Sequence, residues 1–152
     1  MCLVMTIGLG LLITMSSPSS APQPKAETLT LAGEVCELAT ALRSLGLTSD
    51  PEPIAKQVVL KTKDNTLHPL LSDEASRALF VDRRLRDRRA ELKVRRYPGI
   101  PYLQVITVQV DFDGTLGTPE YYCEICTISV RSPQTCPCCQ GEMVLRKRPD
   151  SR

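Results

Sequence analysis

The feature that most constrains this chain is a group of cysteines close to its carboxyl end. Residues 121–143 read YYCEICTISVRSPQTCPCCQGEM and hold five of the seven cysteines. Two C-x-x-C pairs lie in this segment, with nine residues between them. Structural zinc sites use four soft ligands in a tetrahedron, and two such turns supply four thiolates. The spacing therefore predicts a structural Zn²⁺ site whose ligands are Cys123, Cys126, Cys136 and Cys139.

The residues around the pairs resemble the short zinc-ribbon pattern, in which an aromatic residue precedes C-x-x-C and C-P-x-C with a glycine follows. The matching residues outside the ligands are Tyr122, Pro137 and Gly141. Thr127 and Gln140 depart from the pattern, because glycine often follows each cysteine turn there. The resemblance implies a zinc-ribbon-like module over residues 119–148, and a segment this short usually needs a metal or disulfides to fold. The extra thiol of Cys138 is an alternative ligand to Cys139.

Two other uses of the cysteines remain open. If the chain is exported, it enters an oxidising compartment, which favours disulfides. Removal of Cys2 with a signal peptide would then leave an even number of cysteines, Cys36 included, that could pair. A C-x-x-C pair is also the reactive motif of thiol–disulfide oxidoreductases. Such motifs open a helix, whereas Pro133 and the β-branched residues at 127–130 favour a hairpin here.

The amino-terminal residues predict a targeting segment. The stretch from Cys2 to Met15 is apolar and uncharged. It is shorter than the run of about 20 residues that a membrane-spanning helix needs, but it has the length of a secretory hydrophobic region. No basic residue precedes it, and a buried helix is the alternative. We expect a signal peptide or membrane anchor at 1–18, a flexible linker at 19–27, and an exported, periplasmic or membrane-anchored protein.

The middle of the chain, residues 28–114, reads mainly as β-strands. The segment AELKVRR alternates Ala90, Leu92 and Val94 with charged residues, which is typical of a half-exposed strand. Asp64 and Asn65 suit a hairpin turn, and Pro69 indicates an edge strand. One helix is expected after Ser72, with Asp73 and Glu74 in its first turn and arginines near its end.

The order of three strands, a helix and two strands resembles that of the OB fold, a five-stranded Greek-key barrel. This resemblance implies a small OB-like β-barrel for residues 28–114. The expected fold class is thus mainly β with a minor α+β component: an OB-like barrel followed by the zinc-ribbon-like module.

The histidine, aspartate and cysteine residues outside the cysteine cluster do not form a recognisable catalytic motif. The single histidine, His68, excludes histidine-rich metal centres and paired-histidine catalysis. Asp111 and Asp113 are expected to shape a turn and not to bind calcium, because the other ligands of a calcium loop are absent. Cys36 is expected in the core. The net charge of +2 favours no class of partner. One segment is strongly basic, which is usually a solvated face, but nucleic acid, a membrane surface or a protein are alternative partners for it. Its cations are Arg83, Arg84, Arg86, Arg88, Arg89, Lys93, Arg95 and Arg96.

These observations favour a non-enzymatic binding or interaction protein at the cell envelope, with an unknown protein or envelope component as partner. In this arrangement the chain is similar to small exported bacterial proteins that join a signal segment to a compact β domain. No catalytic or cofactor-binding residue is expected beyond the zinc ligands. The alternatives are an envelope thiol–disulfide oxidoreductase that uses one C-x-x-C pair, and an intracellular nucleic-acid-binding protein built from an OB fold and a zinc ribbon.

Overall fold

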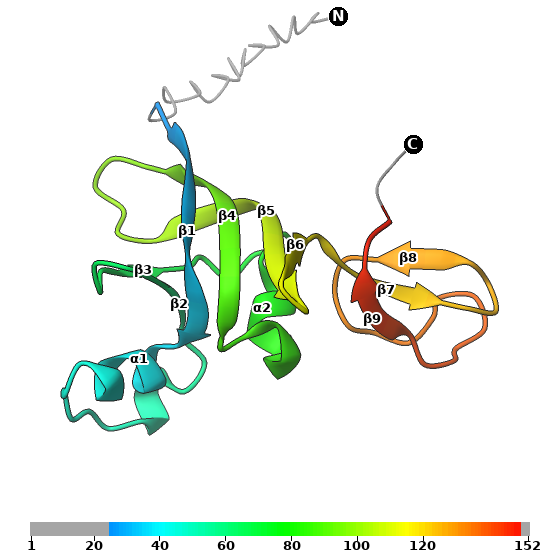
Figure 1. Ribbon diagram of the computed structural model, residues 1–152, viewed down its shortest axis with the longest axis horizontal. Helices are drawn as coiled ribbons and strands as arrows, with labels where there is room; N and C mark the ends of the chain where they lie inside the picture. The colour runs from blue at the N-terminus through cyan, green and yellow to red at the C-terminus, as the bar shows by residue number, and fades with distance from the viewer. Residues whose placement is uncertain (1–24, 150–152) are drawn as a thin grey trace, which may run out of the picture.

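The chain forms two antiparallel β-sheets, one large and one small (Figure 1). The computed structural model describes residues 25–149. Strands make up 43% and helices 14% of the structure, which confirms the expectation of a mainly β fold. The large sheet has the order β3-β2-β1-β4-β5-β6, and the small sheet has the order β8-β7-β9.

The strand bounds follow the alternation of apolar and polar residues. The large sheet consists of β1 Glu27–Glu37, β2 Val58–Thr62, β3 Leu67–Pro69, β4 Arg88–Arg96, β5 Leu103–Phe112 and β6 Thr115–Gly117. The small sheet consists of β7 Pro119–Cys123, β8 Ile128–Val130 and β9 Val144–Lys147. Ala90, Leu92 and Val94 of β4 are fully buried, as their alternation predicts. The division into two domains stays a prediction.

The predicted targeting segment lies outside the described residues, as does most of the predicted linker. None of the helices within residues 25–149 has the length and apolarity needed to cross a membrane. The exported location therefore stays a prediction.

Strand β1 is the centre of the large sheet, because it pairs with β2 on one side and with β4 on the other. The chain needs a glycine at position 33, where β1 crosses β2 closely. A Cβ atom on Gly33 would clash with the carbonyl oxygen of Lys61. The β2–β3 hairpin turns at Asp64 and Asn65, and Asn65 has a φ of 63°, a left-handed conformation that asparagine tolerates.

The large sheet does not close into a barrel, and this corrects the expected OB-like closure. Leu70, the residue after β3, forms one isolated parallel bridge with Leu103 of β5. The N–H of Leu71 donates to the carbonyl of Leu103 at 2.9 Å. Strand β3 is three residues long and ends at Pro69, which has no N–H to donate. Too few donors remain at this edge to form a closing ladder.

The helices differ from the expectation. Helix α2 spans only Arg77–Val81 and is followed by a 3₁₀ turn, η2, at Arg83–Leu85. Ser72 does not cap it, because the buried side chain of Ser76 donates to the carbonyl of Leu71 at 2.6 Å and holds the preceding loop out of the helix. A second helix, α1 at Leu38–Ser44, lies in a region where the sequence predicts only one helix, and it is followed by the 3₁₀ turn η1 at Glu52–Ile54.

One hydrophobic core continues through both sheets. Leu60, Leu79 and Leu92 are fully buried in the large sheet and the helix that covers it. Tyr121 and Met143 of the small-sheet region belong to the same cluster. The small sheet, drawn in orange and red at the right of Figure 1, is thus packed against the rest of the chain through side chains that both parts share.

Candidate metal centre

The four predicted ligands come from two turns of the small sheet. Cys123 ends β7, and Cys126 lies in the turn that leads to β8. Cys136 and Cys139 lie in the loop that connects β8 to β9. Because β7 pairs with both β8 and β9, the sheet brings the two turns to the same end of the module.

Each C-x-x-C pair forms a turn closed by the same backbone hydrogen bond. The N–H of Thr127 donates to the carbonyl of Cys123 at 2.8 Å, and the N–H of Gln140 donates to the carbonyl of Cys136 at 2.9 Å. The N–H of Cys126 also points at the sulfur of Cys123, at 3.5 Å. Turns of this kind place two sulfurs on one side and stabilise thiolates through backbone N–H groups.

The four sulfur atoms converge. All of them lie within 4.8 Å of one another, and the sulfurs of Cys123 and Cys139 are 3.6 Å apart. Tetrahedral zinc with Zn–S bonds of about 2.3 Å requires sulfurs about 3.8 Å apart. The six cysteines within residues 25–149 are all free thiols, with no disulfide among them. The arrangement can hold a metal ion, and four soft sulfur donors suit zinc.

Hydrogen bonds within the site lower the pKa of one thiol, that of Cys136. Backbone N–H groups of Cys139 and Cys138 donate to the sulfur of Cys136 and lower its pKa to about 6. Cys126 differs, because hydrogen bonds with neighbouring thiols, Cys138 and Cys139 first, raise its pKa. A bound cation would favour the thiolate at all four positions.

The remaining residues of the cysteine motif have distinct places. A Cβ atom on Gly141 would lie 3.3 Å from the sulfur of Cys139, so the chain passes this ligand with little room to spare. Cys138 is exposed, and its thiol hydrogen-bonds with that of Cys126, but its sulfur is not one of the four that all lie within 4.8 Å of one another. Cys139 therefore has the better geometry as the fourth ligand.

The two departures from glycine carry backbone strain. Thr127 has a φ of 56° and Gln140 a φ of 60°, so both adopt the left-handed conformation that glycine adopts at no steric cost. The turn geometry is thus preserved without glycine. Threonine is the more strained of the two because it is β-branched.

A polar cluster that the sequence analysis missed supports the small sheet. The buried carboxylate of Glu120 accepts hydrogen bonds from Arg146 at 2.8 Å and Arg148 at 3.1 Å. Burial would raise the pKa of Glu120, but these bonds outweigh burial and lower it. The guanidinium of Arg146 also stacks over the ring of Tyr122 at 3.4 Å. The pairing of β7 with β9 brings these arginines to Glu120, and no local sequence motif predicts the register of that pairing.

A second missed contact ties the small sheet to the α2–η2 segment. The hydroxyl of buried Tyr121 donates to Asp82 at 2.7 Å, and Arg84 donates to the same carboxylate at 2.7 Å. Burial would raise the pKa of Asp82, but the hydrogen bonds from Arg84 and Tyr121 hold it at about 2. Burial and then the bond to Asp82 raise the pKa of Tyr121. Tyr121 lies two residues before Cys123, the first of the predicted cysteine ligands.

The basic segment does not form one free cationic patch. Arg84 pairs with Asp82, Arg86 with Glu37 at 2.8 Å, and Arg89 with Asp111 at 3.4 Å. Arg88 donates to the backbone carbonyl of Asp111 at 2.8 Å. Arg83, Lys93 and Arg95 have no ion pair within the described part of the chain. Most of these cations are engaged inside the chain, and nucleic-acid binding through them stays a prediction.

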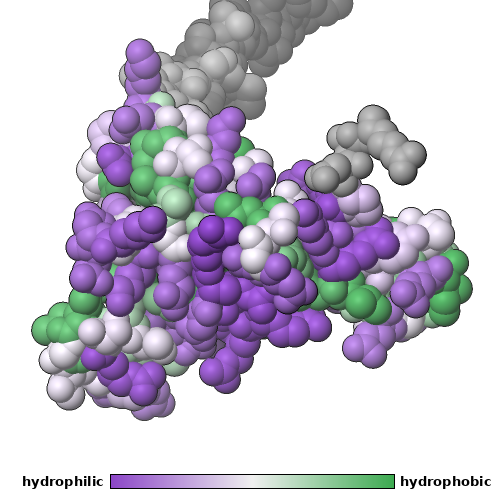
Figure 2. Space-filling view, in the orientation of Figure 1, coloured by the Kyte–Doolittle hydropathy of each residue, from purple (hydrophilic) through white to green (hydrophobic). Residues whose placement is uncertain are grey.

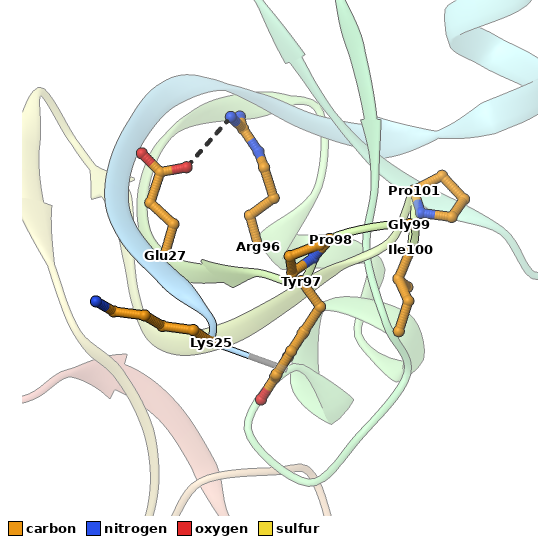
Figure 3. A pocket seen from close by; sticks show the side chains of 8 residues that line it. All are labelled: Lys25, Glu27, Arg96, Tyr97, Pro98, Gly99, Ile100 and Pro101. Atoms are coloured by element: carbon orange, nitrogen blue, oxygen red, sulfur yellow. Dashed lines mark ion pairs between the residues drawn. The ribbon is translucent and has the colours of Figure 1, made fainter. Parts of the chain in front are cut away.

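Arg96 lies at a hollow of about 480 Å³ beside the β4–β5 loop. It faces Glu27 at 3.7 Å, while the side chains of Tyr97 and Ile100 point away from this pair (Figure 3). The hollow is open and holds no group of metal-binding side chains.

The other candidate residues do not assemble into a site. His68 lies half-buried in β3, opposite Leu60. Cys36 is 3% exposed in a small second core around α1, and burial raises its pKa to about 11, so it is a core residue as expected. Across residues 25–149, the four cysteines are the only group of histidine, cysteine and acidic side chains placed to share a metal ion.

Comparison with known proteins gives no relative: no protein-family model, no curated protein and no solved structure matches this chain.

Proposed function

We propose that the chain is a non-enzymatic interaction protein of the cell envelope in which Cys123, Cys126, Cys136 and Cys139 hold a structural zinc ion. The observation that carries the proposal is the convergence of four free sulfurs within 4.8 Å of one another on two matched turns. Four protein thiolates fill a tetrahedral zinc site and leave no position for water or substrate. The ion would therefore cross-link the two turns and would not catalyse hydrolysis.

Such a cross-link would stabilise the fold of the small sheet. Strands of three to five residues make a poor independent sheet, and a segment of about 30 residues rarely forms a sufficient core. Structural zinc contributes about 10 kcal/mol or more to modules of this size. Two features of the chain itself also stabilise the module. A backbone N–H group donates to the sulfur of Cys123, and the buried Glu120 cluster joins β7 to β9.

Burial argues against dithiol exchange at the same cysteines. In a reactive C-x-x-C pair the first thiol attacks and must be accessible. Here the first thiol of each pair is the buried one, with Cys123 at 1% and Cys136 at 0% exposure. Both pairs also lie in turns that follow strands or loops and do not open a helix.

The metal content of the purified full chain tests the proposal. We expect about one zinc per chain by elemental analysis, and loss of that zinc on Cys123→Ser or Cys136→Ser. Cys138→Ser is the matched control: the Cys138 thiol neighbours Cys126 but is not one of the four mutually close sulfurs, so this variant should retain zinc. Replacement by cobalt adds a readout on the unaltered chain, since thiolate charge-transfer bands report sulfur ligands. A wild-type chain without metal would refute the zinc site.

The location at the envelope rests on the apolar run from Cys2 to Met15. Cell fractionation with intact-mass measurement tests it. We expect the protein in the envelope fraction, and recovery only from the cytoplasm at full mass would contradict the location and leave the zinc site unaffected.

A further inference from the structure

The seam between the two sheets contains a small apolar pit with arginines at its rim. The pit has a volume of about 150 Å³. Its walls come from α2 and the preceding loop, from β5, and from the segment that joins β6 to β7. Ala78, Val108 and Pro119 are buried there, and Ile106 is half-buried. The pit is smaller than the roughly 300 Å³ at which sites for drug-sized ligands begin. It suits a single apolar side chain.

Two guanidinium groups stand at the rim of this pit with unused donors. Arg131 is exposed, and within residues 25–149 it makes no hydrogen bond or ion pair. Arg148 donates to Glu120 from Nε, and in the same part of the chain its two terminal nitrogens have no partner. Arginine presents these donors in a fork that fits a carboxylate. The rim therefore favours a negatively charged group beside the apolar side chain.

A second hollow continues the first along the seam. It has a volume of about 220 Å³ and is lined by Lys147, Leu116 and Gln109, among others. The two hollows share Thr118 and Arg148, so they form one path across the seam. Where the two sheets meet, the visible face of the molecule has hydrophobic residues next to hydrophilic ones (Figure 2). An extended segment of a few residues can place one side chain in the pit and its neighbours beside Arg148 and Lys147.

We propose that this seam binds a segment of a partner protein in which acidic residues flank one apolar side chain. Charge complementarity selects the acidic residues, and the apolar floor selects the side chain between them. Single-stranded nucleic acid fits less well, because no aromatic side chain lines either hollow and base stacking needs one. The inference deepens the proposed function, on which it rests, because Arg131, Lys147 and Arg148 all belong to the module that the zinc site would hold.

Fluorescence anisotropy with the zinc-loaded full chain tests the inference. The probe is a fluorescein-labelled peptide of sequence Glu-Glu-Leu-Glu-Glu. We expect saturable binding that weakens with added salt, and weaker binding of Gln-Gln-Leu-Gln-Gln and of Glu-Glu-Ser-Glu-Glu. Arg131→Ala should weaken binding about tenfold, because it removes a charge-assisted hydrogen bond to a carboxylate. Arg95→Ala is the matched control, since Arg95 is exposed on β4 away from the seam, and it should leave the affinity unchanged.

The same samples distinguish the two proposals. No binding by a chain that carries its zinc overturns the seam and leaves the zinc site intact. Equal affinity of the Arg131→Ala and wild-type chains, or tighter binding of a fluorescein-labelled oligothymidine than of the peptide, also overturns it. Peptide binding that depends on Arg131, in a chain that is purified without metal, supports the seam, and the missing zinc refutes the zinc site. Peptide binding that disappears with a zinc chelator supports both.

Discussion

At the scale of single residues, the two cysteine turns show how a motif can keep its geometry without its usual glycines. Thr127 and Gln140 both have positive φ angles, at the positions where the ribbon pattern has glycine. A left-handed conformation destabilises a residue with a Cβ atom by roughly 1–2 kcal/mol. Glycine avoids this steric cost, but it loses more conformational entropy on folding, which costs roughly 0.5–1 kcal/mol. The turns are therefore held in place by the contacts around them.

Substitution of these two residues by glycine should stabilise the protein. We expect Thr127→Gly to raise the free energy of unfolding by about 1 kcal/mol, and Gln140→Gly to raise it by less, since only threonine is β-branched. Denaturant unfolding of the metal-loaded chain measures both. Thr135→Gly is the control, because Thr135 is exposed in the β8–β9 loop that also holds Gln140 and has no positive φ, so glycine there should destabilise the protein. A loss of stability in Thr127→Gly would show that its hydrogen bond to the Cys126 carbonyl outweighs the strain.

The sequence predicts these residue-scale features well because they are local. The cysteine pairs, Pro69 and the Asp64–Asn65 turn each act through their own backbone or a partner a few residues away. The residues that sequence reasoning missed, Glu120 and Asp82, act through partners 26 and 39 residues away, Arg146 and Tyr121. Such pairs depend on strand register and on sheet packing, which no short pattern encodes.

At the scale of elements, the contact of β7 with η2 connects the small sheet to the large one. Tyr121→Phe removes the hydroxyl that donates to the buried Asp82 carboxylate. A hydrogen bond to a charged group contributes about 2 kcal/mol, so we expect the free energy of unfolding to fall by about that amount at pH 7. Tyr122→Phe is the control, since its hydroxyl has no hydrogen-bond partner among the described residues and its ring still stacks with Arg146.

The pH dependence of that loss follows from the pKa of Asp82. The folded-state pKa is about 2, below the ordinary value of 3.8. A depressed pKa gives a contribution that is complete above the ordinary value and is lost as the pH falls through 2. The difference between the wild type and Tyr121→Phe should therefore be constant from pH 5 to pH 8. A difference that changes within this window would contradict the assignment of Asp82 as the acceptor.

The helices were harder to predict than the strands because their limits are set by tertiary contacts. Ser76 is fully buried and bonds to the loop before α2, so the acidic residues expected in the first turn lie outside the helix. Helix α1 is built from good helix formers such as Leu38, Ala39 and Ala41, but it has no side-chain cap and lasts seven residues. Gly46, Pro51 and Pro53 follow closely, and such residues favour turns over helices.

At the scale of the whole molecule, the order of strands was predictable and the closure of the sheet was not. Alternation fixes which residues face the core, and neighbouring strands in sequence pair as β1 with β2, β2 with β3, and β4 with β5. Closure would need a ladder between β3 and β5, which are more than 30 residues apart in sequence. The shortness of β3 decides against it.

The shared core predicts how the molecule would respond to removal of the proposed metal. Cys123, Cys136 and Met143 pack in the same cluster as the large-sheet residues, but the small sheet has few other long-range supports. We expect a zinc chelator to accelerate amide hydrogen exchange strongly in residues 119–147 and only modestly in β1, β4 and β5. Hydrogen-exchange mass spectrometry of the full chain measures this, with the chelator pre-saturated with zinc as the control. Unchanged exchange would refute a structural metal. Equal acceleration throughout would show that the two sheets unfold as one unit, because loss of the metal then removes the large sheet's stability through the shared core.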